Sequence, residues 1–335
     1  MFISGFVMQR AKSPGCGRAW LESGLYETGR AAGRGVRHRV AARYHSAMKF
    51  MQIDVFTSVP FRGNPVAVVL DADDLSTDEM QRIAAWTHLS ETTFVCKPTL
   101  AGADYLLRIF TPTTELPFAG HPTIGSAHAV LETGMVKPVD GRFRQECGAG
   151  VLDLVVKGEG EAQTIWVRAP QPLVTPLGES RLDVLESALG GKVAGRAPLC
   201  VDVGPVWAVA DLGSASAVAA LRPDMAALAT FSNDAVVTGV VAFGASDDGV
   251  SAIHVRAFAP AHGVPEDPVC GSGNVSVGIF LHRYDQLGRF GRSYRARQGM
   301  QLGRDGTVSI RVGEGGEIDL GGQAVTCIEG SLRVR

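Results

Sequence analysis

The sequence predicts an α+β protein built from two similar lobes, and three observations lead to this prediction. The frame Arg-x-Phe-x-Pro occurs twice, beginning at Arg108 and at Arg256, 148 residues apart. A related Gly/Pro/Val segment precedes each copy, at Gly63 and at Gly204. Short β-branched apolar runs outnumber stretches of helical periodicity, which indicates that strands dominate in mixed sheets. Similar segments repeated in the same order indicate an internal duplication.

Length and composition fit about two globular domains. The chain has 335 residues, of which 45% are hydrophobic and 20% charged, and its formal net charge is −2. We assign residues 48–168 to an N-terminal lobe, to which residues 322–335 can return, and residues 169–321 to a C-terminal lobe. The balanced charge gives no indication of a nucleic-acid partner. No segment reaches the run of about 18 apolar residues that a membrane span requires.

The first 47 residues differ from the rest of the chain. Residues 1–47 are rich in arginine and glycine, poor in acidic side chains and without a hydrophobic period. Such a start is compatible with a transit peptide or an RNA-binding tail. We favour a disordered or artefactual extension ahead of a true start at Met48 or Met51. Its apolar opening is too short for a secretory signal.

The six cysteines are scattered along the chain without Cys-x-x-Cys pairs. At this chain length their spacing indicates neither a disulfide framework nor a zinc site. A reducing compartment, the cytoplasm, is therefore the expected location, and no metal site is expected.

Periodicity and turn residues place the predicted elements in order. In the first lobe, strands are predicted at 52–56, 66–70, 92–96, 105–110, 150–156 and 164–167, and helices at 78–86 and 124–131. The helix at 78–86 begins with the capping box Ser76-Thr-Asp-Glu. In the second lobe, strands are predicted at 200–203, 207–210, 235–243, 254–258, 308–312 and 317–320, and helices within 215–229 and from the Gly-Ser-Gly turn at 271–273 to about 284. A last strand is predicted at 324–328.

Each lobe contains a junction where a strand leads through a polar loop into an apolar helix. These helices begin near Gly120 and near Gly271. The first turn of a helix has free backbone N–H groups and the positive end of a dipole, so each junction suits a carboxylate. Two lobes related by a pseudo-twofold axis would bring both helix starts to one cleft.

Three titratable side chains, one at the entry to a strand and two beside these junctions, are candidates for proton transfer. Glu91 lies at the entry to a predicted strand among uncharged neighbours, where burial would raise its pKa. A solvated surface carboxylate is the alternative. His121 is either a hydrogen bonder of the helix start or a proton donor. Asp267 precedes Pro268, a pair that ordinarily marks a turn, but its place beside the duplicated junction favours function.

Cys270 is a candidate for a different chemistry, in which a thiol acts as the base or nucleophile. A thiol at a helix N-terminus tends to have a lowered pKa and can act as a base or nucleophile. A two-base racemase would require a matching thiol, but aligning Gly120 with Gly271 places Ala119 opposite Cys270. That kind of epimerase is therefore disfavoured. A dinucleotide site is disfavoured as well, because Ser276 occupies the third glycine position of the fingerprint.

Five motifs, in order along residues 48–335, resemble the PhzF-like phenazine-biosynthesis family, which shares its fold with diaminopimelate epimerase and proline racemase. They are G-N-P-V-A-V-V at Gly63, L-S-E-T-T-F-V at Leu89, R-I-F-T-P-T-T-E-L-P-F-A-G-H-P-T at Arg108, E-D-P-V-C-G-S-G-N at Glu266 and Q-G-M-Q-L-G-R at Gln298. The resemblance implies two α/β lobes, each with mixed strands curled around a central helix. It also implies a cofactor-free site between the lobes and a homodimer.

The resemblance further implies roles for individual residues. Glu91 would be the acid/base that moves a proton between carbons, and His121, Asp267 and Ser272 would line the same site. The sequence departs from the family pattern at Gly273-Asn274 and at Ala119, where many members carry cysteine. Both departures touch the pocket and leave the substrate open.

The function predicted from these residues is a cofactor-independent isomerase acting on a small carboxylated metabolite. Glu91, His121 and Asp267 would carry the chemistry. The residues predicted to bind the substrate lie at the two helix starts and are Gly120, Thr123, Cys270, Gly271, Ser272 and Gly273. Two alternatives remain: a racemase with Cys270 and Glu91 as unlike bases, and a non-catalytic binding protein on the same scaffold.

Overall fold

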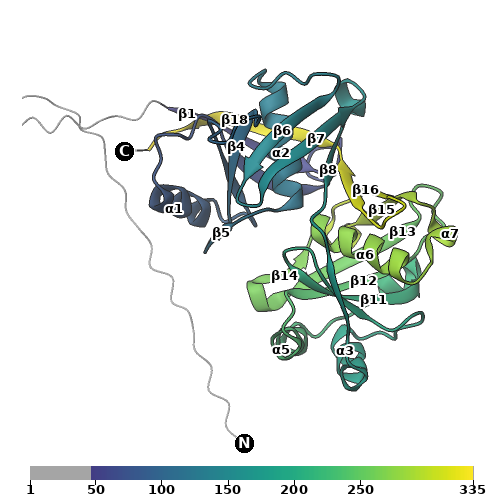
Figure 1. Cartoon of the computed structure of the whole chain (residues 1–335). Helices are drawn as coiled ribbons and strands as arrows, with labels where there is room; N and C mark the ends of the chain where they lie inside the picture. Colours follow the sequence, from purple (N-terminus) through teal and green to yellow (C-terminus); the bar gives the residue numbers. More distant parts are fainter. Residues whose placement is uncertain (1–46, 335) are drawn as a thin grey trace, which may run out of the picture. The chain divides into compact units, whose positions relative to one another are not determined.

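Eighteen strands join edge to edge in one mixed sheet, which the computed structural model describes over residues 47–334 (Figure 1). The predicted extension lies outside the described residues except for Ala47. The N-terminal lobe contains β1 (Met48–Val55), β2 (Asn64–Val69), β3 (Thr92–Cys96), β4 (Tyr105–Phe110), β5 (Glu115–Leu116), β6 (Arg142–Cys147), β7 (Gly150–Lys157), β8 (Thr164–Arg168) and the returning strand β18 (Ala324–Leu332). The C-terminal lobe contains β9 (Leu173–Pro176), β10 (Leu199–Asp202), β11 (Val206–Ser214), β12 (Gly239–Ala245), β13 (Ile253–Ala259), β14 (Val264–Asp267), β15 (Ser293–Gln298), β16 (Gly306–Val312) and β17 (Ile318–Gly322).

The order of hydrogen-bonded strands is the same in both lobes. It runs β18–β1–β2–β3–β4–β6–β7–β8 in the first and β9–β10–β11–β12–β13–β15–β16–β17 in the second. The parallel pairs β2/β3 and β4/β6 recur as β11/β12 and β13/β15. Strand β8 pairs with β17 and joins the two copies. The predicted duplication and mixed sheets are confirmed, while the residue boundaries between the lobes stay a prediction.

A central helix fills each lobe. The α-helices among residues 47–334 are α1 (Thr77–Thr87), α2 (Gly120–Glu132), α3 (Leu182–Leu189), α4 (Ala215–Ala220), α5 (Met225–Ala235), α6 (Gly271–Arg283) and α7 (Leu287–Phe290). Helix α2 is buried along most of its length and packs on β1, β2 and β8, while α6 packs on β10, β11, β16 and β17. Small residues in both helices let the surrounding strands approach closely. This arrangement confirms the predicted α+β class with two pseudo-symmetric lobes.

The structure corrects several details of the second lobe, where the strand predicted at 235–243 is β12 (Gly239–Ala245) and helix α7 was not predicted. The single helix predicted within residues 215–229 is two helices, α4 and α5, because Pro223 interrupts the run and Asp224 caps a new helix through the N–H groups of Ala226 and Ala227. Helix α3 was not predicted from the sequence. It buries Leu185, Ala188 and Leu189 against a second apolar cluster of this lobe. The first-lobe helix at 78–86 is confirmed as α1, with its capping box.

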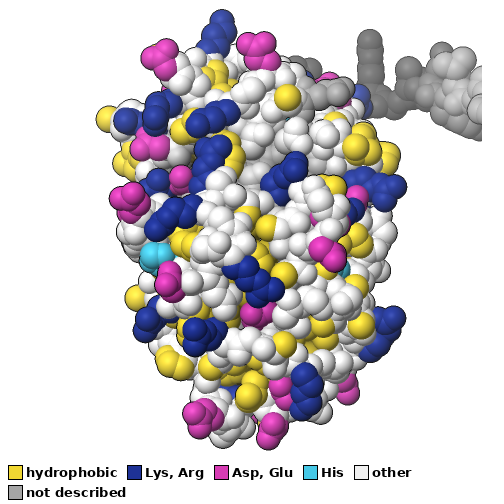
Figure 2. Space-filling model, turned by 90° about the vertical axis from the view of Figure 1, so that its right-hand side faces the viewer, with side chains coloured by type: hydrophobic (Ala, Val, Ile, Leu, Met, Phe, Trp, Pro, Cys, Tyr) yellow, Lys and Arg dark blue, Asp and Glu magenta, His cyan; other side chains and the backbone are white. Residues whose placement is uncertain are grey.

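Charged side chains of both signs are interspersed over the face shown in Figure 2. This distribution agrees with the small net charge and gives that face no extended region of one sign. Within residues 47–334, none of the helices has the length and hydropathy needed to cross a membrane.

Candidate active site

The two loops that enter the central helices are copies of one another. Strand pairing places Leu116 opposite Ile109 and Asp267 opposite Ala257, and these positions are equivalent in the repeated arginine frame. The loops therefore align as Glu-Leu-Pro-Phe-Ala-Gly and Glu-Asp-Pro-Val-Cys-Gly. The C-terminal loop carries a carboxylate and a thiol where the N-terminal loop carries Leu116 and Ala119.

The starts of α2 and α6 lie against each other. A methyl group added to Gly120 would stand 2.7 Å from Leu320 Cδ2 and 3.8 Å from the Cα of Gly271. A methyl group on Gly271 would stand 3.2 Å from the same leucine atom and 3.5 Å from the backbone nitrogen of His121. The approach depends on glycine at both positions, and it brings the two predicted helix starts together.

Each helix start offers two backbone N–H groups that the helix itself does not use. In α2, the N–H of Thr123 already donates to the carbonyl of Ala119, and Pro122 has no N–H. The donors of Gly120 and His121 therefore have no partner within the helix. Their orientation along the helix axis favours a bound negative charge.

The start of α6 repeats this pattern through different contacts. The N–H of Cys270 donates to Gln298 Oε1 over 3.2 Å, and the N–H of Gly273 donates to Cys270 Sγ over 3.3 Å. The N–H groups of Gly271 and Ser272 are then the ones without a partner inside the helix. Four such donors thus lie around the junction of the two lobes, two from each.

Glu91 and His121 face each other in the N-terminal lobe. Glu91 Oε2 lies 3.2 Å from His121 Nε2, yet both atoms are buried without a hydrogen-bond partner among the described residues. Burial raises the pKa of Glu91 to about 7, against a smaller opposing effect of a hydrogen bond with Ser90. Burial also lowers the pKa of His121 to about 4, although nearby carboxylates act in the other direction. At neutral pH the imidazole is therefore neutral and the carboxyl group populates both protonation states.

Asp267 joins this pair from the C-terminal lobe. Burial raises the pKa of Asp267 to about 6, and the negative charge of Glu91 raises it further. The charge of His121 and the backbone N–H of Val269, which donates to Oδ1 over 3.0 Å, lower the same pKa. The three residues predicted to carry the chemistry are thus brought together, and each one is electrostatically coupled to at least one other.

The thiol of Cys270 does not have the lowered pKa that its place at a helix start predicts. Burial raises the pKa of Cys270 well above its ordinary value, and the carboxylate of Asp267 adds to the rise. The sulfur caps α6 by accepting from Gly273, and this contact does not compensate for lost solvation. Cys270 is therefore a neutral thiol at physiological pH and a structural cap.

The remaining residues predicted to bind the substrate differ in whether their hydrogen-bonding groups are already used within the protein. The hydroxyl of Thr123 accepts a hydrogen bond from Gln145 over 3.2 Å, and its N–H donates within α2, so neither group is free in this structure and the binding role of Thr123 stays a prediction. The N–H of Gly273 is likewise taken, by the thiol of Cys270. The hydroxyl of Ser272 accepts from Trp207 Nε1 over 3.0 Å and stays at the junction.

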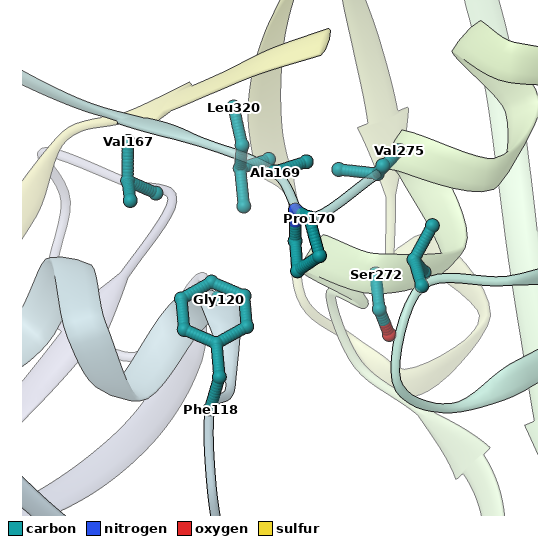
Figure 3. A pocket seen from close by; sticks show the side chains of 9 residues that line it. Phe118, Gly120, Val167, Ala169, Pro170, Ser272, Val275 and Leu320 are labelled. Atoms are coloured by element: carbon teal, nitrogen blue, oxygen red, sulfur yellow. The ribbon is translucent and has the colours of Figure 1, made fainter. Parts of the chain in front are cut away.

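A small cavity lies beside the helix starts (Figure 3). Its volume is about 10 Å³, the space of roughly one water molecule. Figure 3 shows the ring of Phe118 and the side chain of Ser272 on opposite walls. Its lining residues are mostly apolar: Phe118, Gly120, Val167, Ala169, Pro170, Val203, Ser272, Val275 and Leu320. This cavity is too small for a metabolite, so a substrate that reaches the helix starts from this side requires the lobes to separate.

Sequence reasoning missed two buried amides that hold the Asp-Pro-Val-Cys loop. Gln298 Nε2 donates to the carbonyl of Asp267 over 2.8 Å, and its Oε1 accepts from Cys270 and Asn274. Asn64 Nδ2 donates to Asp267 Oδ1 over 2.9 Å. Asn64 lies in the segment at Gly63 that indicated the duplication and the resemblance, and Gln298 lies in a motif that supported only the resemblance. Their partners lie far away in the chain, so no local signal could reveal them.

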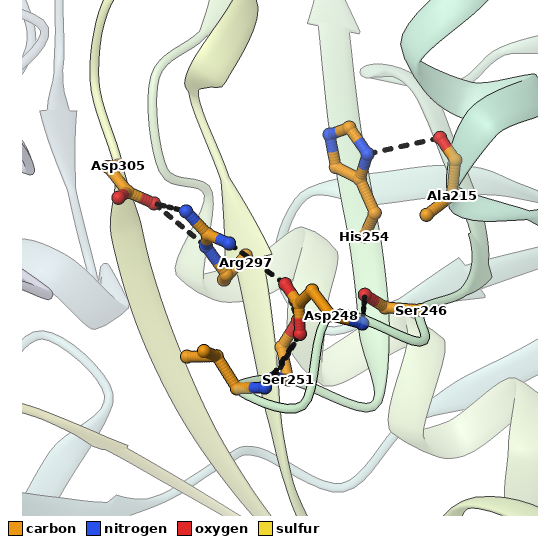
Figure 4. Close-up of polar contacts among 8 residues, drawn as sticks. Ala215, Ser246, Asp248, Ser251, His254, Arg297 and Asp305 are labelled. Carbon is orange, nitrogen blue, oxygen red and sulfur yellow. Dashed lines mark hydrogen bonds and ion pairs between the residues drawn. The ribbon is translucent and has the colours of Figure 1, made fainter.

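The strand that carries Gln298 is itself held in place (Figure 4). The preceding residue, Arg297, lies between two carboxylates, with Nη1 2.8 Å from Asp248 Oδ2 and Nε 2.9 Å from Asp305 Oδ1. Asp248 in turn accepts from the backbone N–H groups of Val250 and Ser251. These contacts join the β12–β13 loop to β15 and support the amide that clamps the loop.

Comparison with known proteins decides the family. Residues 53–330 match the family model described as phenazine biosynthesis-like protein. The chain belongs to the phenazine biosynthesis-like protein family. A relative from Schizosaccharomyces pombe, named antisense-enhancing sequence 1, is 43% identical and covers 84% of this chain and 97% of its own length. The trans-2,3-dihydro-3-hydroxyanthranilate isomerase of Pseudomonas chlororaphis is 36% identical over 84% of this chain and 98% of its own length.

A solved PhzF-family structure agrees with this assignment. The phenazine biosynthesis protein of Bacillus anthracis superposes with a TM-score of 0.74 at 24% identity, covering 87% of this chain and 100% of that one. At that identity the likeness shows the shared fold. Several relatives in this family are named isomerases, and the family member described here is accordingly an isomerase.

Proposed function

We propose that this family member moves a proton between two carbons of a small carboxylated substrate, with Glu91 as the acid/base and no metal or organic cofactor. The observation that carries the proposal is the buried, unpartnered carboxyl group of Glu91, with a pKa of about 7, 3.2 Å from His121. A group whose pKa lies near the working pH transfers protons efficiently in both directions.

The proposed reaction uses one group twice. Ionised Glu91 takes a proton from an activated C–H, so that the C–H electron pair moves into the conjugated system of the substrate. Protonated Glu91 then returns the proton to a different carbon, and the double bond shifts accordingly. Neutral His121 accepts or donates a hydrogen bond at a polar group of the substrate, and Asp267 binds another. Atoms and charge balance, because the product is an isomer of the substrate.

The carboxylate of the substrate would be bound where α2 and α6 meet. The N–H groups of Gly120 and His121 from one helix and of Gly271 and Ser272 from the other supply four donors and two positive helix ends. Electron density that moves toward the carboxylate during proton transfer is stabilised by the same donors. Binding and catalysis thereby use the same junction.

The duplicated fold supports proton return from the same side. Thr92 pairs with Phe110 and Val240 pairs with Phe258, at equivalent positions of the arginine frame, so Gly239 stands at the position of Glu91 in the second lobe. Glycine has no side chain that could act as a base, and Ala119 stands at the position equivalent to Cys270. One side of the pseudo-twofold axis therefore lacks the acid/base, which favours an isomerase over a two-base racemase.

Incubation of the protein with candidate substrates in D₂O tests the proposal. The compound in the name of the Pseudomonas relatives, trans-2,3-dihydro-3-hydroxyanthranilate, is the first substrate to try, incubated in D₂O and analysed by mass spectrometry and NMR. We expect an isomeric product and, for Glu91→Gln, a loss of about 10²–10⁴-fold in turnover. Glu115→Gln, on a more exposed carboxylate of the same lobe, is the matched control and keeps its rate. A Glu91→Gln enzyme with near-normal turnover would refute the assignment.

Replacement of Cys270 separates the isomerase from the racemase. Cys270→Ala removes only a helix cap, so we expect turnover within about tenfold of the wild type and a stability loss of about 1 kcal/mol. Deuterium exchange at an amino-acid α-carbon that disappears in Cys270→Ala and survives in Glu91→Gln would establish the racemase instead. The homodimer implied by the resemblance stays a prediction, which sedimentation of the purified chain tests.

A further inference from the structure

One side-chain amide reaches from the N-terminal lobe to the carboxylate of the C-terminal lobe. Asn64, at the start of β2, is 1% exposed. Its Nδ2 donates to Asp267 Oδ1 over 2.9 Å and to the carbonyl of Val269 over 3.0 Å, so both amide hydrogens are used. The N–H of Val269 donates to the same carboxylate oxygen over 3.0 Å. We infer that Asn64 is a positioning residue that holds Asp267 ionised and oriented beside Glu91 and His121, an inference that rests on the proposed function.

The duplication provides an internal comparison. Ala67 pairs with Thr92 and Ala208 pairs with the equivalent Val240, so Pro205 stands at the position of Asn64. Leu116 stands at the position of Asp267. On the other side of the pseudo-twofold axis, both partners of this hydrogen bond are therefore missing. Since the second lobe begins the same strand with proline, which has no side-chain donor, the fold itself does not require an amide here.

The electrostatics explain why Asp267 needs a donor. The titratable groups that face it are Glu91 from the entry to β3, His121 from α2 and Cys270 from its own loop. Glu91 and burial favour the protonated form of Asp267. Two coupled carboxyl groups share protons unless their surroundings differ. Hydrogen bonds to Asp267 favour its ionised form and leave the exchangeable proton on Glu91, which separates the roles of the two groups.

The side-chain amides of Asn64 and Gln298 allow a controlled test. Both amides hold the same loop, but they contact different groups of Asp267. Asn64 donates to its carboxylate, whereas Gln298 donates to its backbone carbonyl. We expect Asn64→Ala to lower kcat/KM about ten- to a hundredfold, the effect of a lost hydrogen bond to a buried charge. Asn64→Gly, which also removes the side-chain donor, is the second variant and should behave alike. Gln298→Ala should loosen the loop without shifting the pH dependence.

Titration of the carboxyl group provides a readout independent of turnover. The protein is labelled with ¹³C at the aspartate carboxyl carbons, the Asp267 signal is assigned with Asp267→Asn, and pH titrations are recorded for wild type, Asn64→Ala, Asn64→Gly and Gln298→Ala. We expect the midpoint of Asp267 to rise by about one pH unit in both Asn64 variants only. An unchanged midpoint in folded Asn64 variants, or an equal rise in Gln298→Ala, overturns the inference. If no substrate is found, the proposed function fails while this titration still decides the role of Asn64.

Discussion

Glu91 Oε2 and His121 Nε2 lie 3.2 Å apart in the interior, and within the described part of the chain neither atom has a hydrogen-bond partner. Unsatisfied buried polar atoms are costly, so a fold that keeps two of them side by side suggests that a third molecule completes the contacts. The proposed substrate would supply those partners when the lobes close. The pair also has opposite pKa shifts with one cause, because burial disfavours the charged form of both groups.

The pH dependence of turnover follows from the pKa of Glu91. The first step requires the ionised carboxylate, whose pKa is raised to about 7 by burial. We therefore expect kcat/KM to increase from pH 5 to pH 9, with an apparent midpoint near 7. Initial rates over that range measure it. A profile that is flat between pH 6 and pH 8 would contradict Glu91 as the base.

The same burial predicts a stability change that needs no substrate. Because the folded pKa of Glu91 is raised from 4.5 to about 7, the folded state binds the proton more tightly than the unfolded state between these values. The contribution of Glu91 to stability is then fully favourable only at low pH and is lost as the pH rises through 7. We expect Glu91→Gln to raise the free energy of unfolding by about 1–3 kcal/mol at pH 8 and by less at pH 5.

Urea unfolding of both proteins at the two pH values measures this difference. Glu115→Gln serves as the control for loss of a carboxylate as such. Equal effects of Glu91→Gln at pH 5 and pH 8 would show that the carboxyl group is not desolvated in the folded protein.

The sequence predicted those parts of the fold that depend on local pattern and on repetition. The arginine frames at Arg108 and Arg256 revealed the duplication, and the capping box at Ser76 located α1. Long-range contacts set the rest. Helix α3 is short and amphipathic, and only its packing against the second-lobe cluster distinguishes it from a loop. Pro223 splits α4 from α5 because Asp224 can cap a new helix, a choice that propensity alone leaves open.

The candidate site was predictable to the same extent. His121 and Asp267 were found because each is a titratable residue beside a duplicated junction, and Glu91 was found because it enters a strand among uncharged neighbours and lies in a motif of the resemblance. Asn64 and Gln298 were missed because amides acquire a role only from their partners, more than 20 residues away in the chain. The pKa of Cys270 was misjudged because its position at a helix start favours the thiolate, whereas burial opposes it more strongly.

The contact between Gly120 and Leu320 predicts a sensitive point at the junction. A methyl group at Gly120 would lie 2.7 Å from Leu320 Cδ2, which is closer than carbon atoms pack. We expect Gly120→Ala to cost about 1–3 kcal/mol of stability and to lower kcat/KM by displacing the free N–H groups of α2. Leu320→Ala in the same chain removes the obstructing atom and should restore part of the activity.

Thermal unfolding and steady-state kinetics of the single and double variants form a double-mutant cycle for this contact. Gly288→Ala is the matched control, since a methyl group there meets nothing within 4 Å. Additive effects of Gly120→Ala and Leu320→Ala would mean that the two side chains do not compete for the same space.

The duplicated arginine frame predicts unequal ion pairs at equivalent positions. Arg256 forms two hydrogen bonds of 2.8 Å with Glu266, and Arg108 forms the corresponding pair with Glu115 at 2.8 and 2.7 Å. The side chains of the first pair are 6% and 7% exposed, and those of the second are 23% and 38% exposed. The geometry is thus matched while solvation differs.

Removing the carboxylate should therefore have different consequences in the two lobes. Glu266→Gln leaves the buried guanidinium of Arg256 without a counter-ion, and its other hydrogen bonds are to the carbonyls of Val218 and Leu221. We expect a loss of about 3 kcal/mol, as for a broken buried pair, against less than about 1 kcal/mol for Glu115→Gln. Urea unfolding at low and high salt measures both. Equal losses of stability in the two variants would show that water reaches the pair formed by Arg256 and Glu266. In that case the loss in both variants would depend on salt concentration, whereas we expect that dependence only for the exposed pair.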